Sequence, residues 1–212
     1  MKRRAARVGL ESVTMRWGDR VVLDDCTCEF VGPGMWAVTG PSGCGKSTLL
    51  NLMMGYLVPT SGTVTCDGSV GYMLQEDMLF SKLSVADNWA VHCAARSVPV
   101  DEAQRTELLG AVGLTGRDDQ VAANLSGGER KRLQLAEMMA ASFDFLLLDE
   151  PTAGLDDANK AILAELMKTL FGGVGVIVAT HDWEFLGLLP AVDTLRMAQG
   201  KLVPTRTGAM LD

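Results

Sequence analysis

The pattern of apolar and polar residues divides the chain into a strand-rich first third, a helical middle and a mixed last third. In the first third, Val8–Trp17 and Val21–Phe30 are predicted strands on either side of Gly18-Asp19, which is a hairpin signal. Shorter apolar runs predict three more strands, at Met35–Thr39, Thr63–Cys66 and Val70–Leu74. The fold is therefore expected to begin with an antiparallel hairpin.

Helical spacing dominates from about Ser84 to Ala141. Ser84 and Asp87 have the spacing of a capping box, which predicts that a helix begins there. Asp101–Val112 has helical apolar spacing and ends at Gly113. Another helix is predicted after Ser126 and runs to about Ala141.

The last third returns to strands and helices in alternation. Phe143–Leu148 and Val174–Thr180 are nearly continuous apolar runs, as is typical of strands buried on both faces of a parallel sheet. Asp157–Phe171 lies between them and predicts a helix that ends at Gly172-Gly173. This order predicts an α/β fold class with a mostly parallel sheet.

Composition narrows the class of protein. The 212 residues suit one domain, and a hydrophobic content of 48% allows a sizeable core. A net charge of −7 argues against a nucleic-acid partner. No stretch approaches the roughly 20 apolar residues of a membrane span, so we expect a cytosolic or peripherally attached chain. The basic cluster of Lys2, Arg3, Arg4 and Arg7 is interpreted as a solvated tail rather than a contact with an anionic membrane surface. No further domain is expected after Gly200-Lys201-Leu202.

The strongest chemical signal is a phosphate-binding loop. The pattern G-x-x-x-x-G-K-S/T is met at every fixed position by Gly40-Pro41-Ser42-Gly43-Cys44-Gly45-Lys46-Ser47-Thr48. It lies between a predicted strand and the apolar helix Thr48–Met54, so a mere glycine-rich turn is disfavoured. Backbone N–H groups and the helix N-terminus would face phosphate oxygens. Lys46 is expected to reach the β- and γ-phosphates, and the Ser47 hydroxyl to ligate Mg²⁺.

Two adjacent carboxylates follow the strand Phe143–Leu148, at the sheet edge where ligands bind in open α/β folds. Asp149 fits a residue that holds Mg²⁺ through its water shell, and Glu150 fits a general base or polariser of the attacking water. A strand that ends in a polar turn is the plainer interpretation. Together with the phosphate loop, however, the pair predicts a site of nucleotide hydrolysis.

Leu125-Ser126-Gly127-Gly128-Glu129 precedes the helix that runs to Ala141. Ser126 and Glu129 form the S-x-x-E spacing of a capping box, which alone explains a helix start. The two glycines are poor helix formers that a cap does not need, but they would let an anion approach the helix N-terminus closely. Both interpretations stay open at this point.

Over nearly its whole length the chain resembles the nucleotide-binding subunits of ABC transporters. The resemblance rests on the order and spacing of the phosphate loop, Gln75, the signature Leu125–Glu129, Asp149-Glu150, Gly154-Leu155-Asp156 and Thr180-His181-Asp182. It implies a P-loop ATPase core at residues 1–75 and 143–212, with a small N-terminal antiparallel β subdomain. It also implies an inserted α-helical subdomain at 76–142 that carries the signature, all within one ABC ATPase domain.

The resemblance implies roles for single residues as well. Trp17 would stack on adenine, an interpretation that we favour over packing on the sheet. Gln75 would sense Mg²⁺ and the attacking water, and His181 would contact the γ-phosphate. A second ATPase subunit in an ATP-dependent head-to-tail dimer would receive contacts from Ser126, Gly127, Gly128 and Asp156.

Three positions depart from the common pattern of the family. Glu129 replaces a glutamine but keeps the capping role, and Glu137 stands where many members carry arginine. The segment Gly62–Gln75 is short, which suggests a trimmed accessory sheet. None of these changes removes a catalytic group.

The leading interpretation is an ATP-hydrolysing subunit, with ATP and Mg²⁺ as cofactors, on the cytoplasmic face of a membrane. It would power transport through separate integral membrane subunits, which we expect to contact Gln75 and Met78–Trp89. The alternative is a soluble ABC ATPase acting on nucleic acid or ribosomes, but Gln75 to Ser126 is too short for the coiled coil of DNA-repair members. An inactive regulatory subunit is opposed by the complete catalytic set. Cargo and direction stay open, although Leu79–Trp89 and Gly127–Leu133 are slightly closer to exporter subunits.

Overall fold

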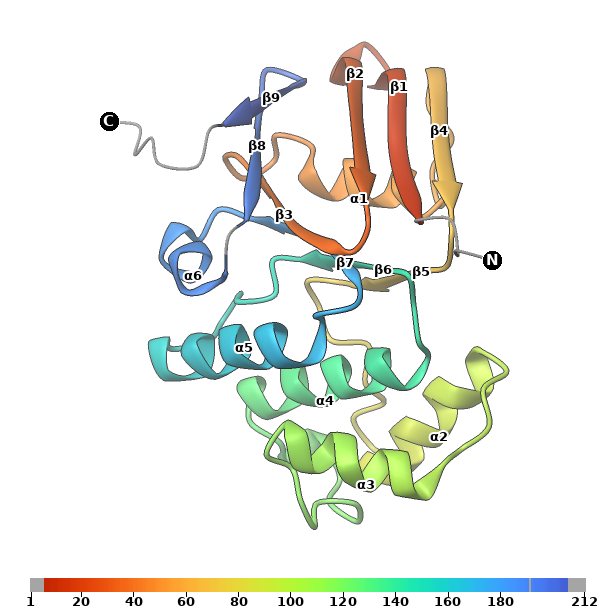
Figure 1. Cartoon of the computed structure of the whole chain (residues 1–212), viewed down its shortest axis with the longest axis vertical. Helices are drawn as coiled ribbons and strands as arrows, with labels where there is room; N and C mark the ends of the chain where they lie inside the picture. Colours follow the sequence, from red (N-terminus) through yellow and green to blue (C-terminus); the bar gives the residue numbers. More distant parts are fainter. Residues whose placement is uncertain (1–5, 191, 206–212) are drawn as a thin grey trace.

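A computed structural model describes residues 6–190 and 192–205. They fold into two β-sheets and a group of helices (Figure 1). Lys2, Arg3 and Arg4 of the basic cluster lie outside these residues, whereas Arg7 lies within them and its Nη1 donates to Oε1 of Glu29 at 3.1 Å. The strands are β1 Arg7–Trp17, β2 Arg20–Val31, β3 Gly34–Thr39, β4 Ser61–Asp67, β5 Val70–Met73, β6 Phe145–Asp149, β7 Gly175–Thr180, β8 Asp193–Ala198 and β9 Lys201–Thr205. The helices are α1 Lys46–Met53, α2 Val85–Ala95, α3 Glu102–Ala111, the short η1 Ala122–Asn124, α4 Gly127–Ala140, α5 Asp157–Leu170 and α6 Trp183–Leu188.

The smaller sheet has three strands in the order β2-β1-β4, and both of its strand pairs are antiparallel. Trp17 pairs with Arg20 at the end of the β1–β2 hairpin, so the predicted turn at Gly18-Asp19 is confirmed. Although β4 and β5 are consecutive in the chain, β5 belongs to the other sheet.

The larger sheet has six strands in the order β5-β6-β7-β3-β8-β9. All neighbours are parallel except β8 and β9, which pair antiparallel. Every residue of β6 and β7 is buried, as the continuous apolar runs of their sequences predict. The predicted α/β fold class, with a mostly parallel sheet beside an antiparallel one, is therefore confirmed.

Helices cover both faces of the larger sheet (Figure 1). Leu49, Leu50 and Met53 of α1 pack in one core between the two sheets. On the opposite face, α4, α5 and α6 share a second core with β6 and β7. A third core joins α2, α3 and α4, and Trp89 is its largest fully buried side chain. These helices form the expected helical region, whereas its division from the core at residues 76 and 142 stays a prediction.

The carboxyl ends of three parallel strands meet at one edge of the larger sheet. In the sheet register, Thr39 at the end of β3 lies beside Thr180 at the end of β7, and Asp149 at the end of β6 lies beside Ala179. The segments that follow these strands therefore begin as neighbours, although more than a hundred residues separate β3 from β6 in the sequence. None of the helices in the described ranges is long and apolar enough to cross a membrane.

The segment after Thr180 carries structure that the sequence patterns did not predict. It forms α6 and the β8–β9 hairpin, which extends the larger sheet past β3. The predicted helices are confirmed with shifts of one or two residues, since α1 begins at Lys46 rather than Thr48 and α4 ends at Ala140. The predicted capping box of Ser84 and Asp87 at the start of α2 is confirmed as well.

Gly175 gives a direct test of how tightly the larger sheet is packed. A Cβ placed on Gly175 would overlap the ring of Phe145, which is fully buried on the neighbouring strand β6. We expect Gly175→Ala to lower the free energy of unfolding by about 1–3 kcal/mol, as overpacking does in cores. Gly172→Ala is the matched control, because nothing lies within 4 Å of its new Cβ, and it should stay within about 0.5 kcal/mol of the parent. Equal urea midpoints for the two variants would contradict this packing.

Candidate functional site

The phosphate loop leaves β3 and turns directly into α1. Gly45 is the N-cap residue of α1 and has a φ of 114°, a left-handed backbone that disfavours residues with a Cβ. A Cβ at Gly45 would also lie 2.8 Å from Cγ1 of Val22 on β2. The glycine therefore lets the loop pass close to the smaller sheet before the helix begins.

A cavity of about 360 Å³, here called the loop cavity, lies against this loop. It brings together most of the residues that the sequence analysis singled out, from the phosphate loop, the hairpin and the strand ends. Its lining contains Trp17, Arg20, Val22, Ser42, Gly43, Gly45, Lys46, Ser47, Thr48, Gln75, Glu150, Ala153 and His181. Gly40, Pro41 and Cys44 belong to the same loop outside this lining, and Cys44 packs against the core between the sheets.

The side chain of Lys46 crosses the base of the loop. Its Nζ donates to the carbonyl of Gly40 at 2.9 Å and to that of Pro41 at 3.3 Å. The same atom lies 3.2 Å from Oε1 of Glu150, and both side chains are largely buried. The lysine is thus held by loop carbonyls and by one carboxylate, and an incoming anion would compete with that carboxylate for it.

Glu150 is placed by an unusual backbone conformation. Its φ of 44° lies in the left-handed region, which non-glycine residues rarely adopt and which recurs at functional sites. The Glu150 N–H donates to the carbonyl of Ala179 at 2.8 Å, so the neighbouring strand β7 supports this turn. The chain direction after Asp149 therefore changes so that the Glu150 carboxylate faces the phosphate loop.

Three side chains stabilise the carboxylate form of Glu150. Oε2 accepts from the Thr180 hydroxyl at 3.0 Å, and Oε1 lies 2.9 Å from Nδ1 of His181. Burial raises the pKa of Glu150, but the hydrogen bonds from His181 and Thr180 and the Lys46 charge outweigh burial and hold that pKa below its usual value. Glu150 is therefore ionised at neutral pH, as a general base must be.

The carboxylate of Asp149 has one oxygen that already accepts a hydrogen bond and one that does not. Oδ2 accepts from the Tyr72 hydroxyl at 3.1 Å, whereas the buried Oδ1 has no hydrogen-bond partner in the described part of the chain. A buried carboxylate oxygen without a partner is costly unless a ligand or water completes it. Together with the Ser47 hydroxyl, Asp149 fits a hard cation such as Mg²⁺. No group of three or more His, Cys, Asp or Glu in the described ranges could hold a metal, but Mg²⁺ bound with phosphates needs only one or two carboxylates.

The signature segment begins α4 with the predicted capping box. The hydroxyl of Ser126 accepts from the Glu129 N–H at 3.2 Å, and Oε2 of Glu129 accepts from the Ser126 N–H at 2.8 Å. The bond from the Ser126 N–H to the carboxylate is the main reason that the pKa of Glu129 lies below its usual value. Glu129 therefore keeps the capping role expected for it.

The two glycines of the signature have different surroundings. Nothing lies within 4 Å of a Cβ placed on Gly127, whereas one placed on Gly128 would overlap the amide of Asn159 on α5. Arg132 donates to that amide at 2.8 Å, and Asp156, the N-cap of α5, accepts from it at 2.9 Å. Gly128 is thus required by packing between α4 and α5, which the sequence patterns did not indicate, while Gly127 stays open to an approaching group.

The signature does not line the loop cavity. Gly127 and the segment Ala153–Leu155 border a separate cleft of about 380 Å³, here called the signature cleft. Gln75 and Ala153 line both spaces and so form the wall between them. Of the signature-side residues predicted to contact nucleotide, Gly127 lines the signature cleft, whereas Ser126, Gly128 and Asp156 line neither space.

Arg20 belongs to the loop cavity and was missed by the sequence analysis. It is the cross-strand partner of Trp17, which is 53% exposed instead of packed on the sheet. A two-residue turn at Gly18-Asp19 places the residues on either side of it opposite one another. The hairpin prediction combined with the interpretation of Trp17 could therefore have found Arg20.

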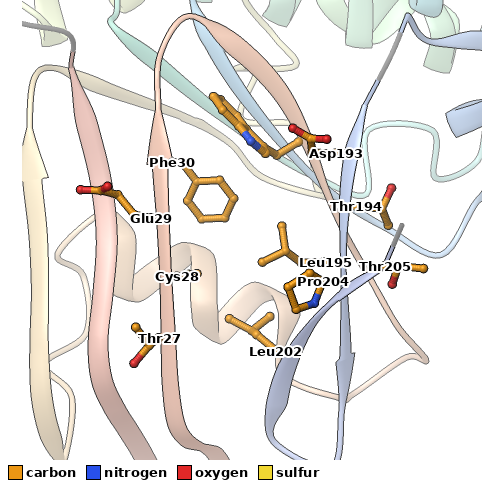
Figure 2. A pocket seen from close by; sticks show the side chains of 11 residues that line it. Thr27, Cys28, Glu29, Phe30, Asp193, Thr194, Leu195, Leu202, Pro204 and Thr205 are labelled. Carbon is orange, nitrogen blue, oxygen red and sulfur yellow. The ribbon is translucent and has the colours of Figure 1, made fainter. Parts of the chain in front are cut away.

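A larger cavity of about 640 Å³ lies away from these residues, between β2 and the β8–β9 hairpin (Figure 2). Phe30 from β2 faces Leu195, Leu202 and Pro204 across it. None of the predicted site residues lines this cavity, so size alone does not identify the chemical site.

Comparison with known proteins agrees with the motifs. The sequence pattern that defines the ABC transporter family matches residues 23–153. The Fe(3+) ions import ATP-binding protein FbpC of Streptomyces coelicolor is 38% identical over 190 residues, which are 82% of this chain and 55% of that protein. The taurine import ATP-binding protein TauB of Pseudomonas aeruginosa is 36% identical over 194 residues, or 86% of this chain and 74% of that protein.

A solved structure shares the fold. It is described as an inward-facing conformation of a putative metal-chelate type ABC transporter, and it superposes with a TM-score of 0.85 at 24% identity. The match covers 98% of this chain and 86% of the other. With the family pattern spanning the phosphate loop, the signature and Asp149-Glu150, the chain belongs to the ABC transporter family as one of its ATP-binding subunits.

Proposed function

We propose that the chain binds and hydrolyses ATP to power an ABC importer. The observation that carries this proposal is the meeting of Lys46, Glu150 and His181 in one cavity beside the phosphate loop. The base would stack on the exposed Trp17, and the loop N–H groups and Lys46 would bind the phosphates. Binding residues on the loop would be Gly40, Pro41, Ser42, Gly43, Cys44, Gly45, Lys46, Ser47 and Thr48.

Hydrolysis would begin with an exchange of partners at Lys46. The γ-phosphate would take Lys46 from Glu150, whose carboxylate then becomes free to accept a proton from the attacking water. His181 would turn towards the phosphate, and Gln75 would orient the water from the wall of the loop cavity. Ser47, Asp149 and Gln75 would hold Mg²⁺, which offsets phosphate charge when bound.

A second ATPase subunit would complete each site. The loop cavity of one copy is open, and the signature cleft that carries Gly127 lies separately, which supports a head-to-tail pairing of two copies. Ser126, Gly127 and Gly128 of one copy would then contact the nucleotide held by Lys46 of the other. Asp156, exposed at the start of α5, would lie where the two copies cross.

Import is the direction that the relatives support, since the FbpC and TauB proteins are both import ATP-binding proteins by name. This outweighs the slight likeness of Leu79–Trp89 and Gly127–Leu133 to exporters. The chain would act on the cytoplasmic face of the membrane, attached to separate integral membrane subunits. A role on nucleic acid or ribosomes gains no support from these relatives.

The membrane subunits would dock in a groove of about 300 Å³ between α2, α4 and β5. Within the expected contact segment Met78–Trp89, Val85 and Trp89 belong to the helical core, whereas Met78 and Phe80 are 66% and 56% exposed. Met78 and Phe80 therefore form an apolar rim suited to a short helix. Glu137 lies at the base of this groove, where burial raises its pKa to about 8, so it adds no full negative charge there at neutral pH.

Replacing Glu150 by glutamine separates binding from chemistry. The amide keeps the shape of the side chain but cannot accept the proton, so we expect the hydrolysis rate to fall by about a hundredfold or more. ATP binding should persist, and size-exclusion chromatography should show an ATP-bound dimer accumulating. The control is Glu165→Gln on α5, because Glu165 is exposed and lines neither the loop cavity nor the signature cleft, and it should keep the parent rate. Parent-like hydrolysis by Glu150→Gln would leave Glu150 with a structural role alone.

Cysteine crosslinking tests the groove. In a background without native thiols, Met78→Cys and Phe80→Cys should crosslink in membranes to an integral membrane protein, with a yield that changes when ATP is added. Val203→Cys on β9 is equally exposed at 54% but lies at the other end of the molecule, so it should not crosslink (Figure 1). Crosslinks from position 203 alone would move the interface away from the groove.

A further inference from the structure

Arg20 places a second cation in the loop cavity. It begins β2 opposite Trp17, and both side chains line the cavity. Nη2 of Arg20 donates to the carbonyl of Gly43 at 3.2 Å, in the middle of the phosphate loop. The guanidinium is therefore held on the loop by this bond, and it has further N–H donors left for a ligand.

Arg20 also differs from Lys46 in its charge balance. Lys46 already faces a carboxylate, because Oε1 of Glu150 lies 3.2 Å from its Nζ. Among the described residues, no carboxylate lies within ion-pair distance of Arg20, which is exposed to the cavity. Since the charges of Lys46 and Glu150 offset each other, Arg20 supplies the unbalanced positive charge that an incoming anion would meet first.

We propose that Arg20 binds the phosphate group nearest the ribose of the nucleotide. This inference rests on the proposed ATP-binding function. Trp17 would take the base and Lys46 the distal phosphates, so a cation beside Trp17 and Gly43 lies between them, next to the α-phosphate. A guanidinium suits this position because its planar fork matches two phosphate oxygens while one N–H stays on the Gly43 carbonyl.

The contact has a consequence for nucleotide selection. The α-phosphate is common to ATP, ADP and AMP, so Arg20 would strengthen binding of all three by a similar factor. Adenosine lacks the group and would gain nothing. A residue that only braced the hairpin against the Gly43 carbonyl would instead affect every ligand that stacks on Trp17, adenosine included.

The test compares the dissociation constants of ATP, ADP, AMP and adenosine for the parent, Arg20→Gln and Arg20→Lys. Weak ligands are measured by competition with a fluorescent ATP analogue. We expect Arg20→Gln to raise the dissociation constants of ATP, ADP and AMP each by roughly fivefold to tenfold. The dissociation constant of adenosine should not change. Arg20→Lys keeps the charge without the planar fork, so its dissociation constants should lie between those of the parent and those of Arg20→Gln. Arg16→Gln is the matched control, since Arg16 is an exposed arginine of the same hairpin outside the cavity lining.

The other outcomes separate this inference from the proposed function. An equal loss of adenosine binding would show that Arg20 only supports the hairpin. A loss of affinity confined to ATP would place the contact on the γ-phosphate. If the parent binds ATP but Arg20→Gln behaves like Arg16→Gln, the inference is wrong while the ATP-binding function stands. A parent that binds no nucleotide would overturn both.

Discussion

The carboxylate of Glu150 joins the three strand ends on which the site depends. It meets Lys46 from the loop after β3, it follows β6 itself, and it accepts from Thr180 and His181 at the end of β7. These contacts exist only because β3, β7 and β6 are parallel neighbours in register, so that their carboxyl ends share one edge. The left-handed backbone of Glu150 turns its side chain towards the loop, and the Ala179 carbonyl supports that turn. The sheet thus sets the geometry before any ligand is present.

The same arrangement underlies the proposed pairing of two copies. Gln75 and Ala153 line both the loop cavity and the signature cleft, whereas Gly127 lines the signature cleft alone. Asn159 fixes the start of α4 against the start of α5 by filling the space beside Gly128. The signature and Asp156 are therefore held together through Asn159, and in the proposed dimer they would form one surface. The groove at Met78 and Phe80 lies against the same helix α4, which connects the proposed membrane contact to the signature.

Most of the catalytic edge could be predicted from the sequence, because its residues occur in short runs tied to apolar strands. The phosphate loop, Asp149-Glu150 and the capping box of Ser126 and Glu129 are of this kind, and the structure places them as local patterns indicate. The strands β8 and β9 were missed since Asp193–Ala198 mixes polar and apolar residues without a clear period. Contacts between distant segments, such as Gly128 on Asn159 or Arg20 on Gly43, leave no periodic signal at all. They depend on how whole elements pack, which local propensity does not determine.

The central claim is that the loop cavity binds MgATP through Lys46, and calorimetric titration tests it most directly. The parent should give a saturable binding heat. Lys46→Ala should lose most of that affinity, because no other lysine or arginine lies within the phosphate loop to replace the charge. Thermal unfolding should show that the variant remains folded, since the core between the two sheets is formed by apolar side chains around α1. Equal MgATP affinity in the parent and in folded Lys46→Ala would contradict the account.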